Sequence, residues 1–421
     1  MIKILEYNLK GKLPDPFVFD NGEHLTSSAD WQRRRKEIYK TAVELQYGEI
    51  PPAPERVSAE PLYINKANPS TYRVSAEANG RELSFSLTVF KAPGGGKHPT
   101  VISGDGCFKY PFDPEYVGTY LKNGINIVFF NRTDIFPDIA RYNTGYVEKD
   151  SGEYKIASDT IAALEGGEGR GPLCKMFPDK KICSVAAWAW GYSRVVDALE
   201  LLGFADMDAI IFTGHSRGGK TAILAGALDE RAAIVNPNGA CAGGCSCYRL
   251  VIKAEKEDGV SVAKSEPLSN IFHHFPTWLG EGMREYVDRE DELPFDSHYL
   301  KAMIAPRVLF VSEAASDIMA NPVGSWQTTM GAYEVYKLLG VEDRLLWYFR
   351  DGDHAQTTED VEQLVNVIRN YKYGEPLNDK YFKTKFEPVP LAFDWRCEDV
   401  IDTAAEKILS EYRESFEELA K

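Results

Sequence analysis

A serine lies between a histidine and an arginine in a glycine-rich stretch, GHSRG, at residues 214–218. The stretch fits the G-x-S-x-G pattern of a nucleophile elbow, in which glycines permit close backbone approach and the serine is held above a sheet in a strained conformation. The apolar run DAIIF precedes it and the small-residue run GKTAILAGALD follows it, so the sequence predicts a strand, a turn and a helix. In the alternative interpretation, Ser216 only caps a helix in a doubly wound protein.

A serine hydroxyl becomes a good nucleophile only when a base removes its proton, so the elbow predicts an acid and then a histidine later in the chain. His354 is the predicted base because it follows the apolar run RLLWYF, in a polar loop expected at the carboxyl edge of a sheet. Asp317 is the predicted acid because it lies in the loop after another apolar run, APRVLFVSE. Glu313, Asp351 and Asp353 remain open as alternatives for the acid, and His354 taken alone fits a surface-loop histidine equally well.

The negative charge that develops on a carbonyl oxygen during serine attack needs N–H donors. Arg217 follows the predicted nucleophile and offers a backbone N–H and a guanidinium, which would suit an anionic or polar acyl group. Gly106 and Cys107, in the loop ISGDGCFKY, are candidates for a second donor. An exposed arginine without a catalytic role is the alternative interpretation of Arg217.

The elements that must position these residues alternate between strand-like and helical runs. Residues 70–103 alternate in strand fashion around an Asn79-Gly80 hairpin turn, which predicts an antiparallel start to the sheet. Strand-like runs such as INIVFFN and AAIVNP then alternate with helical runs such as SVAAWAWGYSRVVDALELLG. This order predicts an α/β protein in which helices cover both faces of a mostly parallel sheet. Together with the nucleophile elbow it favours the α/β-hydrolase fold.

Three regions are predicted along the chain. Residues 1–60 form an N-terminal arm packed on the main domain, and residues 61–375 form the α/β-hydrolase catalytic domain. Residues 376–421 form a C-terminal extension that ends in an amphipathic helix, CEDVIDTAAEKILSEYRESFEELAK.

The composition narrows the classes of partner. A net charge of −15 over 421 residues disfavours nucleic acid and anionic membrane surfaces as partners. The start of the sequence has no signal-peptide pattern, which predicts a cytoplasmic protein, or a secreted one if the natural chain is longer. The seven cysteines are expected to be free thiols, and the spacing of Cys241, Cys245 and Cys247 is not that of a zinc site, so no metal or cofactor is predicted.

The sequence around the elbow resembles that of the glucuronoyl esterases. These are carbohydrate esterases that cleave esters of glucuronic acid, and they include the 4-O-methyl-glucuronoyl methylesterases. The segments GHSRGGKTAILAGALDERAA, DWQRRRKEI, LPFDSHYLKAMIAPRVLFV and RDGDH carry the resemblance, which covers roughly four fifths of the chain, residues 13–373. It implies Ser216 as nucleophile, His354 as base and Arg217 as helper of the oxyanion. It also implies that Lys220 reaches the hydroxyls of the uronate and that Glu266 binds the sugar.

The family places its acid at one of two positions, and the sequence departs from the family at two others. The position after the strand that follows the elbow helix reads NPNGACAGG, without a carboxylate, which leaves Asp317 in the later loop. Met319 stands where many members have a tryptophan that packs on the uronate, and it can fill the same apolar volume. His215 stands where the family often has cysteine.

The sequence and the resemblance together predict a serine esterase that forms an acyl-enzyme intermediate. Its expected substrate is a small-molecule or oligosaccharide ester, most of all a glucuronoyl ester. One alternative is an acetyl xylan esterase or sugar deacetylase, and another is a hydrolase-fold protein that binds a ligand without turning it over. Core packing is the preferred interpretation of Trp278, Trp326 and Tyr299, and a sugar cleft is the alternative. The sequence gives no prediction of the oligomeric state.

Overall fold

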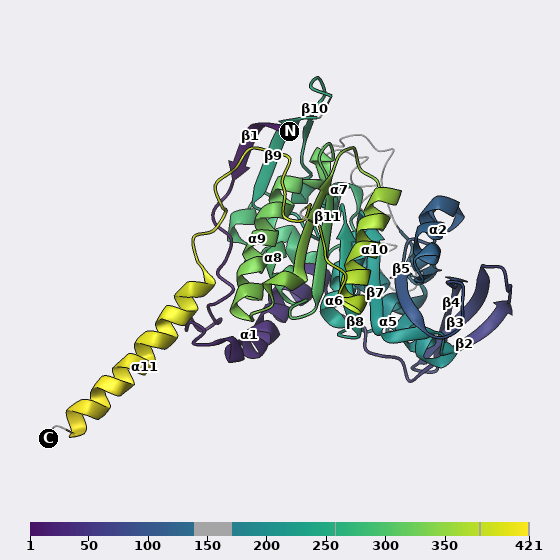
Figure 1. Ribbon diagram of the computed structural model, residues 1–421, viewed down its shortest axis with the longest axis horizontal. Helices are drawn as coiled ribbons and strands as arrows, with labels where there is room; N and C mark the ends of the chain where they lie inside the picture. The colour runs from purple at the N-terminus through teal and green to yellow at the C-terminus, as the bar shows by residue number, and fades with distance from the viewer. Residues whose placement is uncertain (139–170, 257, 379, 420–421) are drawn as a thin grey trace.

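The structure is a computed structural model of the 421-residue chain, and it describes residues 1–138, 171–256, 258–378 and 380–419. A nine-stranded sheet forms its centre, in the order β12-β11-β8-β7-β5-β6-β4-β3-β2 (Figure 1). The pairs from β12 to β6 are parallel, and β6, β4, β3 and β2 pair antiparallel. The strands are β2 (Arg56–Tyr63), β3 (Ser70–Ala78), β4 (Arg81–Phe90), β5 (His98–Ser103), β6 (Asn126–Phe130), β7 (Ala205–His215), β8 (Ala232–Asn238), β11 (Val308–Ala314) and β12 (Leu345–Arg350).

Helices cover both faces of this sheet because its central strands are apolar on both sides. Ile210 and Phe212 of β7 belong to the core under one helical layer, while Ile211 belongs to a second core under the other layer. Residues of α2 and α10 pack in the second core, and those of α5, α6, α8 and α9 pack in the first. The helices are α1 (Trp31–Ile38), α2 (Pro114–Lys122), α4 (Pro172–Met176), α5 (Ser184–Leu202), α6 (Arg217–Leu228), α7 (Leu268–His274), α8 (Ser297–Ala302), α9 (Pro322–Leu338), α10 (Thr358–Tyr373) and α11 (Cys397–Leu419). The predicted α/β class, antiparallel start and parallel continuation are confirmed.

Strand pairing and buried side chains both tie the N-terminal arm into the body. Strand β1 (Lys3–Leu9) pairs with β9 (Leu250–Glu255), which also pairs with β10 (Val262–Lys264), in a separate three-stranded sheet. Trp31 of α1 is fully buried in the main core. Strand β2 begins at Arg56, before the predicted boundary at residue 60, and the predicted division into three regions stays a prediction.

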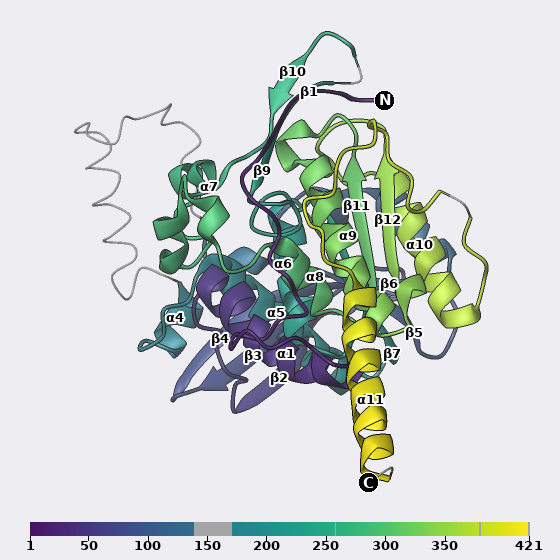
Figure 2. The same ribbon diagram turned by 90° about the vertical axis from the view of Figure 1, so that its left-hand side faces the viewer.

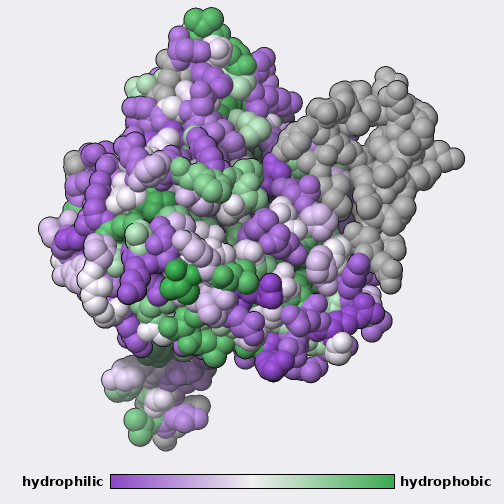
Figure 3. All heavy atoms as spheres, turned by 90° about the vertical axis from the view of Figure 1, so that its right-hand side faces the viewer, coloured by the Kyte–Doolittle hydropathy of each residue, from purple (hydrophilic) through white to green (hydrophobic). Residues whose placement is uncertain are grey.

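The C-terminal helix α11 extends away from the body in both ribbon views (Figures 1 and 2). Ile408, Tyr412 and Phe416, spaced four residues apart, are exposed on it. Hydrophilic side chains cover much of the face seen in Figure 3, with hydrophobic ones interspersed. Among the described residues, no helix is both long enough and apolar enough to cross a membrane.

Candidate active site

Ser216 occupies the sharp turn between β7 and α6, as the sequence predicts. Its φ of 57° and ψ of −118° lie in a region that a residue with a side chain rarely adopts, so the surrounding fold must hold it there. Glycine is required on both sides: a Cβ on Gly214 would clash with the backbone of Gly218, and a Cβ on Gly218 would clash with the carboxylate of Asp105. The turn thus presents Ser216 at the start of α6, where the positive end of the helix dipole favours negative charge.

His354 and Asp317 meet Ser216 at the carboxyl edge of the sheet. His354 Nε2 lies 2.8 Å from Ser216 Oγ, and His354 Nδ1 lies 2.6 Å from Asp317 Oδ2. Asp317 follows β11 and His354 follows β12, and these two strands are parallel neighbours, so their end loops lie side by side. Asp317 is almost fully buried, while the His354 side chain is about 29% exposed and accessible to a substrate. This geometry fits a base oriented by an acid and aimed at a serine.

The alternative acids lie elsewhere. Glu313 is fully buried on β11, and burial raises the pKa of its carboxyl group to about 8. Asp351 and Asp353 are exposed side chains that pair with Lys385 and Lys256, respectively. Asp317 is therefore the carboxylate that the structure brings to His354.

His215 packs beside the proposed base. The two imidazole rings have centroids 4.5 Å apart, and His215 Nδ1 lies 2.7 Å from Asn238 Oδ1. Burial, together with the nearby His354, lowers the pKa of His215 to about 3, so its ring stays neutral. A neutral ring here does not oppose the positive charge that His354 acquires when it accepts a proton.

The Arg217 guanidinium is held between an acid and two aromatic rings. Arg217 Nη1 lies 2.6 Å from Asp138 Oδ2, and its guanidinium carbon lies 4.8 Å from the Trp278 ring centroid and 5.1 Å from that of Phe275. Phe275 and Trp278 stack with centroids 3.7 Å apart, and the indole N–H of Trp278 donates to Asp138. Arg217, Asp138 and Trp278 thus form one cluster. The sequence did not indicate this cluster because Asp138 is distant from the other two residues along the chain.

The second predicted oxyanion donor is narrowed to one candidate. The Gly106 N–H already donates to the Phe130 carbonyl oxygen at 3.1 Å. Cys107 remains as the candidate in that loop. The loop lies beside the elbow, because the His215 N–H donates to Asp105 Oδ2 at 2.8 Å.

The residues predicted to bind a sugar lie near Arg217 and Trp278. Lys220 is almost fully buried, donates to the Ala240 carbonyl at 2.7 Å, and places its ammonium 5.4 Å from the Trp278 ring centroid. Glu266 is half-buried; burial raises the pKa of its carboxyl group, although Lys220, His354 and Arg217 oppose that rise. The Glu266 N–H donates to the carbonyl of Met319, whose side chain is 41% exposed.

The three clustered cysteines are buried free thiols with separate surroundings. Cys241 Sγ donates to the Gly239 carbonyl, and Cys247 Sγ contacts Asp296. Burial raises the pKa of all three thiols, Cys245 to about 12, which keeps them protonated at neutral pH.

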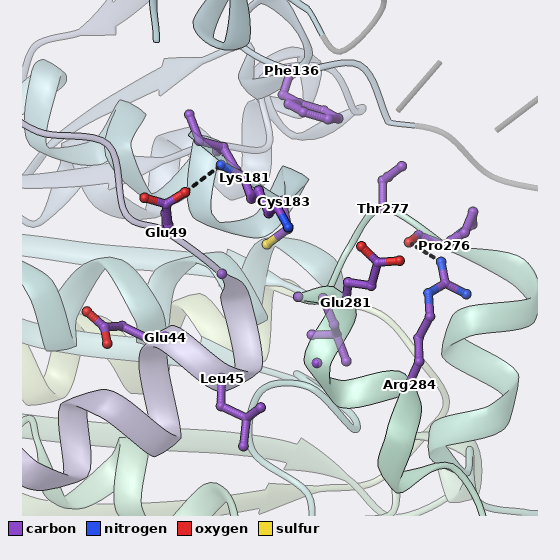
Figure 4. A pocket seen from close by; sticks show the side chains of 15 residues that line it. Glu44, Leu45, Glu49, Phe136, Lys181, Cys183, Pro276, Thr277, Glu281 and Arg284 are labelled. Atoms are coloured by element: carbon purple, nitrogen blue, oxygen red, sulfur yellow. Dashed lines mark hydrogen bonds between the residues drawn. The ribbon is translucent and has the colours of Figure 1, made fainter. Parts of the chain in front are cut away.

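A pocket of about 580 Å³ is lined in part by residues of the segment 276–284 (Figure 4). Its lining includes Pro276, Thr277 and Leu279, which flank Trp278 in sequence, together with Phe136. Carboxylates and cations both reach it, from Glu44, Glu49, Glu281, Lys181 and Arg284. Ser216, His354 and Asp317 are not part of its lining.

Comparisons with known proteins point to one family. A family model described as fungal glucuronyl esterase matches residues 136–340. The 4-O-methyl-glucuronoyl methylesterase of Podospora anserina is 32% identical over 79% of this chain, which spans 61% of that relative's length. The 4-O-methyl-glucuronoyl methylesterase 1 of Wolfiporia cocos is 30% identical over 79% of this chain and 73% of that relative's length. A family 15 glucuronoyl esterase from Caldicellulosiruptor kristjansonii has a similar structure, with a TM-score of 0.75 and 27% identity over 91% of this chain and 97% of its own.

These similarities confirm one prediction and overturn another. The α/β-hydrolase fold is confirmed by the match to the solved esterase over nearly its whole length. The prediction of a cytoplasmic protein is wrong, because the homologous glucuronoyl esterases are secreted enzymes that act on plant cell wall polysaccharides.

Proposed function

Because this chain belongs to the glucuronoyl esterase family, we propose that it is a serine-dependent carboxylic ester hydrolase that acts on esters of glucuronic acid. The hydrogen-bonded series Ser216, His354 and Asp317 supports this most strongly, since it supplies a nucleophile, a base and an acid at one edge of the sheet. The substrate would be a small-molecule or oligosaccharide ester. The expectation that nucleic acid and membranes are not partners stays a prediction from the net charge.

The proposed reaction proceeds in two halves. Ser216 Oγ attacks the ester carbonyl while His354 Nε2 takes its proton, and Asp317 keeps Nδ1 protonated and facing itself. The negative oxygen of the tetrahedral intermediate is stabilised at the start of α6 and by Arg217. The alcohol leaves with the proton from His354, which gives a glucuronoyl ester on Ser216. Water, deprotonated by His354, then attacks this ester and releases glucuronate and the free serine.

The proposed sugar contacts come from the other side of the site. Lys220 and Glu266 would bind the hydroxyls of the uronate, as the family resemblance implies, and Met319 would pack on its ring. The grouping of Glu266 with Lys220, His354 and Arg217 in one electrostatic neighbourhood supports this assignment. A half-buried carboxylate beside a buried lysine can pair with several hydroxyls at once, which suits a sugar more than an acetyl group.

A substrate panel tests the proposal. Hydrolysis of benzyl glucuronate would be measured beside 4-nitrophenyl acetate and acetylated xylose. The proposal predicts that kcat/KM for the uronate ester exceeds that for acetylated xylose. A preference for acetylated xylose would instead identify a sugar deacetylase, and the uronate roles of Lys220 and Glu266 would have to be withdrawn.

A further inference from the structure

Strand β12 ends in a loop, residues 351–357, that carries His354 and leads into α10. In this loop Asp351 and Asp353 are exposed and Thr357 is half-exposed, whereas Gln356 is buried. Since a mostly polar loop at the surface buries little apolar area, we expect hydrogen bonds to do much to fix its conformation. Because His354 has to remain 2.8 Å from Ser216 Oγ, whatever holds the loop also sets the geometry of the base.

Arg350, the last residue of β12, supplies three of these hydrogen bonds, all to backbone carbonyls of the loop. Its guanidinium is almost fully buried. Nη1 donates to the Asp351 carbonyl at 2.6 Å, and Nη2 donates to the Asp353 carbonyl at 2.9 Å and to that of Ala355. The carbonyls on both sides of His354 thus converge on one planar cation, which a lysine ammonium could not satisfy in the same directions.

Asp360 anchors the guanidinium from α10. Its Oδ2 accepts from Arg350 Nε at 2.8 Å and also from the Thr357 N–H at 2.8 Å and Thr357 Oγ1 at 3.0 Å. The Thr357 and Asp360 contacts form the capping box that begins α10. The start of the helix and the base loop therefore share one buried ion pair.

The same unit reaches the acid loop through Gly352. The Gly352 carbonyl accepts from the Ser316 N–H at 2.9 Å, directly before Asp317. Gly352 has a φ of 93°, and a Cβ there would lie 3.1 Å from Arg350 Nη1. The loops of the proposed acid and base are therefore joined at Gly352, next to the Arg350 guanidinium.

We propose that Arg350, anchored by Asp360, is a positioning residue that holds His354 in its productive orientation toward Ser216. This rests on the proposed function only in that Ser216 must act as a nucleophile. Removing the guanidinium releases three carbonyls and lets the imidazole move, and a displacement of about 1 Å can cost about 100-fold in rate. The loss is expected in kcat, since the hydrogen bonds of Arg350 go to Asp360 and to the backbone of the loop that carries His354.

Arg307 offers a matched control. Its guanidinium also collects three backbone carbonyls, those of Gly226, Asp229 and Ala232, but just before β11 begins, at the opposite end of that strand from Asp317. Arg307→Ala and Arg350→Ala therefore remove comparable hydrogen bonds. Only the second is expected to disturb the base.

The test compares Arg350→Ala, Arg350→Lys and Arg307→Ala with wild type in kcat and KM, and in the rate at which a fluorophosphonate labels Ser216. We expect Arg350→Ala to lose about 100-fold in kcat and in labelling rate, with KM nearly unchanged, and to recover part of both when guanidinium ion is added at low millimolar concentration. Arg307→Ala should lose thermal stability but keep both rates. If Arg350→Ala does not fold, Arg350→Lys, which retains the charge beside Asp360, carries the same test with a smaller loss.

Rates for the Arg350 variants within twofold of wild type, or losses equal to those of Arg307→Ala, would overturn the positioning role. Labelling also separates this proposal from the proposed function. Wild type that is labelled at Ser216 but does not cleave uronate esters refutes the substrate while Arg350 is still tested. Wild type that is not labelled at all refutes both.

Discussion

The two sides of the site are built differently. The base and acid stand on loops that follow neighbouring parallel strands, and backbone hydrogen bonds such as Ser316 N–H to the Gly352 carbonyl join these loops. The proposed sugar side is assembled from Lys220, Glu266 and Trp278, which come from different segments. Arg217, the proposed helper of the oxyanion, lies between the two sides, where Asp138 and Trp278 hold its guanidinium. We therefore expect the chemistry to depend on the loops that the sheet brings together, and the choice of ester to depend on the side chains of the proposed sugar side. Substitutions on the first side should lower kcat for every ester, and those on the second should discriminate between esters.

The largest expected effect is on the chemical side. Asp317→Asn keeps the shape of the acid but allows the wrong imidazole tautomer, so kcat should fall by about 10⁴ for uronate and acetate esters alike. Asp353→Asn is the control, because its carboxylate is exposed and pairs with Lys256. Steady-state kinetics on benzyl glucuronate and 4-nitrophenyl acetate would measure both. A loss confined to one of the two esters would contradict the division between the two sides.

An intermediate effect is expected on the sugar side. Glu266→Gln and Lys220→Met each remove a charged hydrogen-bonding group, worth about 1.5–3 kcal/mol or about 10- to 100-fold. kcat/KM for benzyl glucuronate should fall by that factor, while kcat/KM for 4-nitrophenyl acetate changes little. Glu281→Gln, an exposed carboxylate lining the pocket in Figure 4, serves as the control. Equal losses on both esters would place Lys220 and Glu266 in the chemical half instead.

The smallest expected effect is on the thermal stability of the protein, through the buried carboxyl group of Glu313. Burial raises the pKa of Glu313 from its ordinary 4.5 to about 8, so the folded state holds a proton that the unfolded state releases at lower pH. The stability that Glu313 contributes is complete below pH 4.5 and is lost as the pH rises through 8. Glu313→Gln cannot ionise, so its Tm should match or trail that of wild type at pH 5 and exceed it by a few degrees, about 2–4 °C per kcal/mol, at pH 9.

Thermal unfolding across that pH range would measure the difference, with exposed Glu342→Gln as the control. A difference in Tm that stays constant from pH 5 to pH 9 would show that Glu313 is already ionised in the folded protein.

That Ser216, Asp317 and His354 lie at one edge of the sheet could be anticipated from the sequence, whereas their catalytic roles stay predictions. The runs before Ser216, Asp317 and His354 are apolar and end in polar loops, and the ends of parallel strands must meet at one edge. Asp317 could be preferred over Glu313 by its place in the loop, and the structure brings it to His354.

The sugar side and the supports of the loops were less accessible. Asp138 lies 79 residues before Arg217, and no periodic pattern links them. Arg350 is the last residue of an apolar strand, where a charged residue usually indicates that the chain has reached solvent. Its guanidinium is buried instead, because three carbonyls and Asp360 face it. The pairing of β1 with β9 was also missed, since an edge strand near the start of a chain carries no sign of its distant partner.

The most direct test of the account is the hydrolysis of benzyl glucuronate by wild type and Ser216→Ala, with mass analysis of the peptide containing residue 216 after acid quenching. The account predicts that the variant loses about 10⁶-fold in kcat, and that wild type quenched during turnover carries a glucuronoyl group on Ser216. A Ser216→Ala variant that hydrolyses the ester within a few-fold of wild type, with no modified peptide in either protein, would contradict it.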